Sequence, residues 1–86
     1  MTTRILLVDD HAVVRSGLRM LLENERDIEI VGEAVSAHGA IEATMSLKPD
    51  VILMDIGLPD LSGIDATREI KKRGPEAAIV ALTIHE

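Results

Sequence analysis

Acidic residues follow two of the apolar runs in this chain, and they are the side chains best suited to chemistry. Asp9 and Asp10 come directly after the run Ile5–Val8, and Asp55 comes directly after Val51–Met54. If these runs are neighbouring parallel strands, their carboxyl ends meet at one edge of the sheet, where ligands bind in open α/β folds. The spacing therefore predicts that the three carboxylates converge on one site.

Three neighbouring carboxylates favour a bound divalent cation. Two unit charges about 4 Å apart repel by about 4 kcal/mol at an effective dielectric constant near 20. Mg2+ removes that cost and prefers carboxylate oxygens, water and a phosphate oxygen as ligands. A carboxylate beside bound Mg2+ can also attack phosphorus and form an acyl phosphate. We therefore expect a Mg2+ site at Asp9 and Asp10, next to a phosphorylatable Asp55.

A further apolar run, Ile79–Thr83, ends in a hydroxyl that would lie at the same edge of the sheet. The hydroxyl of Thr83 could hydrogen-bond a phosphoryl oxygen there. Single members of the group have structural explanations, because Asp10 could cap the following helix and Asp55 could be a loop aspartate. His11 is expected at the solvent-facing start of a helix, not as a metal ligand. The shared position of the acidic residues and the threonine favours the functional interpretation.

The apolar runs predict the strands that must position these residues. Four strands are expected: Ile5–Val8, Ile28–Ala34, Val51–Met54 and Ile79–Thr83. Three of them are almost continuously apolar, which is typical of parallel strands covered on both faces. Ile28–Ala34 alternates between apolar and polar residues, as an edge strand should.

Three helical patterns lie between the strands. The second should begin after Ser36 and stop at Lys48-Pro49-Asp50, and the third should begin at the capping sequence Ser62–Asp65 and end at Gly74-Pro75. The first has apolar residues at helical spacing that are expected to face the core: Val14, Leu18, Leu21 and Leu22.

The resulting order β-α-β-α-β-α-β predicts one α/β domain with a doubly wound parallel sheet and right-handed crossovers. The expected strand order is the flavodoxin-like order 2-1-3-4, in which the first and third strands are neighbours and the acidic residues converge.

Composition excludes several classes of function. The 86 residues carry a net charge of −6, which makes direct binding to nucleic acid unfavourable. There is no cysteine, which excludes disulfides and thiolate metal sites and is typical of the cytoplasm. The apolar run that follows the first four residues is too short for a signal peptide or a membrane span.

Two segments, Ile5–His11 and Val51–Gly63, resemble the receiver domain of two-component response regulators. The second segment is the more specific, with a proline four residues and a glycine eight residues after Asp55. Val14–Leu18 and Val31–Ala34 resemble the subclass in which a helix-turn-helix DNA-binding domain follows the receiver. The resemblance covers the whole chain.

The resemblance implies that Asp55 is the phosphoacceptor and that a sensor histidine kinase supplies the phosphoryl group. In such a protein, phosphorylation would control transcription through the effector domain. It implies further roles for residues of this chain: Asp9, Asp10 and the backbone carbonyl of Gly57 as Mg2+ ligands, Thr83 as the switch hydroxyl, and Pro59 and Gly63 as residues that shape the loop.

The chain departs from the family pattern at its end. Residues 1–86 are expected to form a partial receiver domain, without the family's fourth helix, fifth strand and fifth helix. The family's conserved lysine belongs to that fifth strand, and none of Lys48, Lys71 and Lys72 is expected to replace it. Phosphorylation should then be weaker than in a complete receiver, and the chain is expected to be a switch and not an enzyme with turnover.

Two other functions remain open at this stage. The chain could be an interaction fragment that keeps the fold without switching. It could also be an Asp-nucleophile phosphatase of the haloacid-dehalogenase type, although there the second aspartate lies two residues after the first, whereas Asp9 and Asp10 are adjacent. Self-association is expected along Ile79–Leu82, because an unprotected apolar edge strand pairs readily with another chain.

Overall fold

The computed structural model describes residues 2–73 and 76–82, in which strands and helices alternate as expected. The strands are β1 (Thr3–Val8), β2 (Ile28–Ala34), β3 (Val51–Asp55) and β4 (Ala78–Leu82). The helices are α1 (Ala12–Glu23), α2 (Ala37–Leu47) and α3 (Gly63–Lys72). Thr83 lies outside the described residues.

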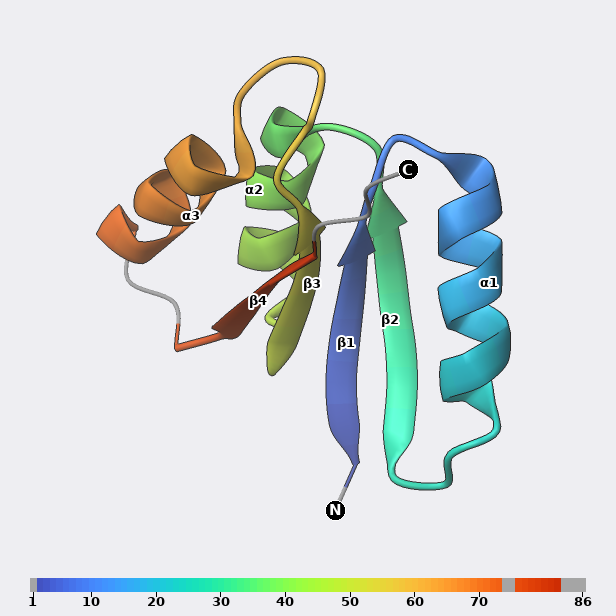
Figure 1. Ribbon diagram of the computed structural model, residues 1–86. Helices are drawn as coiled ribbons and strands as arrows, with labels where there is room; N and C mark the ends of the chain where they lie inside the picture. Colours follow the sequence, from blue (N-terminus) through green and yellow to red (C-terminus); the bar gives the residue numbers. More distant parts are fainter. Residues whose placement is uncertain (1, 74–75, 83–86) are drawn as a thin grey trace.

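All four strands are parallel and form one sheet with the order β2-β1-β3-β4. The chain moves from β1 to β2 in one direction and then returns past β1 to β3. Right-handed crossovers therefore place α1 on one side of the sheet, with α2 and α3 on the other (Figure 1). The doubly wound, flavodoxin-like fold is confirmed.

The main core lies between the sheet and the pair α2 and α3. Leu6, Ile52 and Met54 point into it from the central strands and are almost completely buried. Small residues of the two helices, including Ala40 and Ala66, let the helices approach the sheet closely. The central strands β1 and β3 are thus fixed by packing on this face, and their carboxyl ends are held side by side.

Helix α1 is less well covered. None of its residues is buried, and Leu21 is 71% exposed, so the expectation that Leu21 faces the core was wrong. The reason is that α1 lies on β2, at the margin of the sheet, where Val14, Leu18 and Leu22 become only half-buried. Strand β4 is also less covered than expected, since Val80 is 45% exposed.

The predicted helix starts are confirmed for two helices. Ser36 caps α2 by accepting a hydrogen bond from the N–H of Gly39, and Ser62 caps α3 by accepting one from the N–H of Asp65. The N-cap of α1 is His11, so the alternative in which Asp10 caps this helix was wrong. Within residues 2–73 and 76–82, no helix has the length and apolar character that a membrane crossing would need.

Candidate metal and phosphoacceptor site

The sheet register brings Asp9 and Asp55 together. Val8 of β1 pairs with Met54 of β3, so the next residue of each strand lies at the same sheet edge. Asp9 is 2% exposed, and its N–H donates to the carbonyl of Ala34 at 3.1 Å. Asp9, at the end of a central strand, is thus nearly buried and is held in place by a backbone hydrogen bond to Ala34.

Four side chains converge at this edge and are called the acidic cluster below: Asp9, Asp10, His11 and Asp55. Each offers a ligand atom, and these atoms all lie within 4.8 Å of one another. Asp9 is buried, Asp55 is half-buried, and Asp10 and His11 are exposed. The convergence of the three carboxylates follows from the register and from the strand order.

His11 contacts the carboxylates more closely than the sequence suggested. Its Nδ1 lies 2.9 Å from Oδ1 of Asp9 and 3.1 Å from Oδ1 of Asp10. The hydrogen bond to Asp9, and next the charge of Asp10, raise the pKa of His11 above its ordinary value. The side chain is 65% exposed, so His11 is solvent-facing as expected and also partners the carboxylates.

Arg15 supports the site from α1. Its Nη1 donates to the backbone carbonyl of Asp9 at 2.6 Å, while its Nε donates to Glu33 of β2 at 2.8 Å. Arg15 was not among the site residues predicted from the sequence. A signal was available, because long side chains of a helix point back toward its N-terminus, where Asp9 lies.

The loop after β3 begins at Ile56 and is closed by Gly63. The N–H of Gly57 donates to Oδ1 of Asp55 at 3.1 Å, and the N–H of Gly63 donates to the carbonyl of Ile56 at 2.8 Å. A Cβ atom on Gly63 would lie 2.6 Å from the Cα of Ile56, closer than real Cβ contacts. Pro59 is exposed in the same loop.

The donors at this edge fit Mg2+. Carboxylate oxygens of Asp9, Asp10 and Asp55 are the hard ligands this ion prefers, and the backbone of Gly57 lies directly beside Asp55. The exposed side of the cluster leaves room for the waters that Mg2+ usually retains.

The lysines lie at the end of the molecule opposite to the acidic cluster. Lys48 ends α2, and Lys71 and Lys72 lie in the last turn of α3. Helices of a parallel α/β sheet run opposite to the strands, so their last turns lie far from the acidic cluster. Nζ of Lys71 donates to the carbonyl of Ala77 at 3.2 Å.

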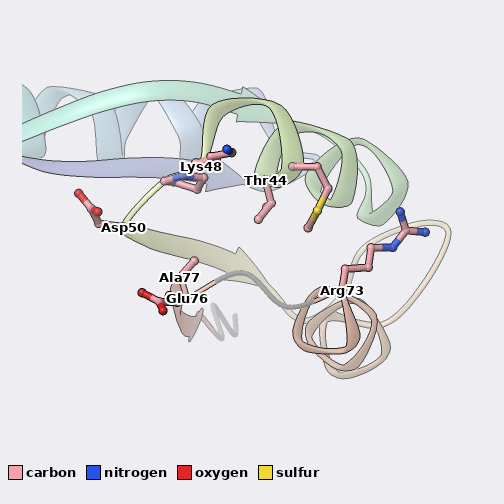
Figure 2. Close-up of a pocket in the computed structure, with 8 residues that line it drawn as sticks. Thr44, Lys48, Asp50, Arg73, Glu76 and Ala77 are labelled. Carbon is pink, nitrogen blue, oxygen red and sulfur yellow. The ribbon is translucent and has the colours of Figure 1, made fainter.

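A pocket of about 560 Å3 also lies at that opposite edge, with Lys48, Asp50, Arg73 and Glu76 in its lining. Figure 2 shows that the charged ends of these side chains point in different directions instead of toward one point. Asp50 is engaged structurally, because its Oδ2 accepts the N–H of Arg4 at 2.8 Å. The chemistry suggested by the sequence therefore belongs to the acidic cluster and not to this pocket.

The fold and the acidic cluster agree with a comparison against known families. The family model described as the response regulator receiver domain matches residues 5–86. The chain belongs to this receiver family. This receiver domain is 47% identical over 83 residues to the response regulator protein VraR of Staphylococcus epidermidis. The match covers 96% of the chain and 40% of that protein, so the chain spans less than half the length of this relative.

Solved structures give the same assignment. A two-component response regulator of the LuxR family from Aurantimonas sp. SI85-9A1 is 41% identical, with a TM-score of 0.92 over 100% of this chain and 61% of that one. RcsB from Salmonella enterica serovar Typhimurium, bound to promoter rprA in the presence of the phosphomimetic BeF3-, is 28% identical. Its TM-score is 0.90, over 100% of this chain and 44% of that one.

Proposed function

We propose that this receiver domain accepts a phosphoryl group on Asp55 from a sensor histidine kinase. Mg2+ would be held by Asp9, Asp10 and the backbone carbonyl of Gly57. The observation that carries the proposal is the convergence of the three carboxylates, with ligand atoms within 4.8 Å, at the carboxyl ends of β1 and β3. Membership of the receiver family supports it.

In the proposed transfer, a carboxylate oxygen of Asp55 attacks the phosphorus of a phosphohistidine. An O–P bond forms as the N–P bond breaks, and the electron pair of the N–P bond stays on the imidazole nitrogen. Bound Mg2+ would neutralise part of the charge on the phosphoryl oxygens. Asp9 and Asp10 would hold the ion, and the N–H of Gly57 would keep Asp55 oriented through Oδ1.

Thr83 lies outside the described residues, and we propose it as the hydroxyl that responds to the phosphoryl group. Its neighbour Leu82 pairs with Asp55 in the sheet register, which supports a position near the phosphoacceptor. We further propose that the chain acts in the cytoplasm and that phosphorylation controls transcription through an effector domain. The BeF3- and promoter complex of RcsB supports this by analogy.

A small phosphodonor such as acetyl phosphate, with mass spectrometry of the acyl phosphate, tests the proposal. One phosphoryl group should be added in the presence of Mg2+, and chelation with EDTA should prevent it. Asp55→Asn should abolish the addition and Asp10→Asn should reduce it strongly, whereas Asp27→Asn, on an exposed loop, should match wild type. Phosphorylation that survives Asp55→Asn would contradict the assignment.

We propose a switch and not an enzyme with turnover. A phosphatase of the haloacid-dehalogenase type would hydrolyse p-nitrophenyl phosphate repeatedly, and this chain should not. Steady turnover of that ester, lost in Asp9→Asn, would favour the phosphatase instead.

A further inference from the structure

Asp60 belongs to the loop between β3 and α3, yet its carboxylate is bound to a different helix. Oδ1 accepts the N–H of Ala37 at 2.8 Å, and Oδ2 accepts the N–H of His38 at 3.0 Å. Both donors are in the first turn of α2, and the loop lies against this turn (Figure 1). The two hydrogen bonds join segments 23 and 22 residues apart in the sequence.

Asp60 and Ser36 together complete the start of α2. The first N–H groups of a helix have no partner within the helix, and the helix dipole favours a negative charge there. Asp60 pairs the first two groups, and Oγ of Ser36 accepts the third, from Gly39, at 3.0 Å. Hydrogen bonds from the N–H groups of His38 and Ala37 hold the pKa of Asp60 at about 2. Asp60 is therefore an anion at neutral pH.

The same loop carries the groups next to the phosphoacceptor. Its base is closed by the hydrogen bond from Gly63 to Ile56, and Leu58 is buried in the core at 8% exposure. Asp60 ties the outer part of the loop to α2. Gly57 lies between these anchors, beside Asp55. The position of Gly57 therefore depends on how firmly the rest of the loop is held.

We propose that Asp60 is a positioning residue for the phosphoacceptor site: its carboxylate clamps the β3–α3 loop to α2 and so fixes Gly57 against Asp55. The inference rests on the proposed function. A clamp of this kind limits the places that the Gly57 carbonyl can occupy and favours the arrangement that a metal needs. A residue that only capped α2 would contribute to stability but would leave the loop unchanged.

Ser36 provides the control that separates the two roles. Ser36→Ala removes a cap from the same helix end without touching the loop, whereas Asp60→Ala removes a cap and the clamp. Both variants should lower the melting temperature, and Asp60→Ala should lower it more because it removes two hydrogen bonds instead of one. Backbone 15N order parameters of Gly57, Leu58 and residues 60–61 in the metal-free chain should fall from rigid values, about 0.85, toward about 0.6 in Asp60→Ala. In Ser36→Ala they should stay near wild type.

A titration with Mg2+ is the second part of this test. Asp60→Ala should weaken Mg2+ binding by about tenfold, the lower end of the effect of groups that support metal ligands, and Ser36→Ala should not. Equal order parameters in the two variants would overturn the clamp. Absence of Mg2+ binding in wild type would overturn the proposed function, while the metal-free measurement would still decide the clamp.

Discussion

The candidate site depends on Gly63, which has no side chain, as much as on the carboxylates of the acidic cluster. Gly63 packs so tightly against the backbone of Asp55 and Ile56 that a Cβ atom would lie 3.0 Å from the Asp55 carbonyl oxygen. The nearest opposing atoms belong to the backbone of Asp55 and Ile56 and cannot rotate away. A larger residue must therefore displace the loop that follows β3.

We expect Gly63→Ala to destabilise the domain by about 1–3 kcal/mol, the usual cost of overpacking a tight site. Gly17→Ala is the matched control, because a Cβ atom at this position in α1 would meet nothing within 4 Å. Replacing this mid-helix glycine should stabilise the chain by about 1 kcal/mol. Urea unfolding of both variants measures the two shifts, and equal signs would contradict the packing argument.

The sequence predicted the acidic residues of the site because each follows an apolar run directly. It did not predict the partners that come from elsewhere in the chain. Asp60 follows a proline in a loop, and nothing local indicates that its carboxylate binds α2, 23 residues away in the sequence. The contact of His11 with two carboxylates was missed because the sequence alone did not fix the backbone of the β1–α1 turn.

At the scale of elements, α1 is joined to β2 by charged contacts. It has no buried residue, and Glu33 of β2 bonds to Arg15 at 2.8 Å and to Arg19 at 2.6 Å. These three residues are called the α1 clasp below. Their side chains are 17% to 36% exposed, so each pair contributes modestly and is weakened by salt.

The α1 clasp predicts a dependence on pH. The hydrogen bond from Arg19, and next that from Arg15, lower the pKa of Glu33 from 4.5. A carboxyl whose pKa is lowered in the folded state stabilises the fold fully above its unfolded pKa, and this stabilisation is lost as the pH falls through the lower, folded pKa. Glu33→Gln should therefore reduce stability at pH 7 and reduce it less at pH 3.

Thermal melts at the two pH values, with Glu42→Gln on the exposed face of α2 as the control, measure this difference. A loss of stability in Glu33→Gln that is equally large at pH 3 would contradict an electrostatic role. It would indicate instead that packing of the Glu33 side chain holds α1.

Sequence periodicity was sufficient to predict the strands and helices and their order along the chain. Bounds differed by a few residues, since β1 starts at Thr3 and β3 includes Asp55. The burial of side chains was less predictable, because the pattern of α1 identifies an apolar face but not how much of that face packs against another element. Leu21 shows this difference, and so does β4, whose continuous apolar run suggested coverage on both faces.

At the scale of the whole molecule, β4 is the edge of the described sheet. It pairs with β3 on one side, and Val80 is 45% exposed. Helix α1 lies over β2, at the opposite margin of the sheet (Figure 1). We propose that the 86-residue chain self-associates along Ile79–Leu82, because an unguarded apolar edge strand offers both backbone groups and side chains to a second copy.

Val80→Lys should weaken this association, since a charge on an edge strand opposes pairing. Ser46→Lys introduces the same charge on an exposed position of α2 and should leave the association unchanged. Light scattering across a concentration series measures the mass of each variant. A wild-type chain that stays a compact monomer at high micromolar concentration would contradict the proposal.

The strand order β2-β1-β3-β4, in which β1 pairs with both β2 and the later strand β3, has a consequence for protein synthesis. Asp9 and Asp55 are 46 residues apart (55 − 9), yet they face each other only after β3 has paired with β1. On the ribosome, β1, α1 and β2 emerge first and can pair among themselves, but the second edge of β1 stays open until β3 has left the exit tunnel. A nascent chain therefore carries Asp9 and Asp10 for dozens of residues before the carboxylate of Asp55 lies beside them. The acidic cluster is therefore complete only after the third strand has been inserted beside β1.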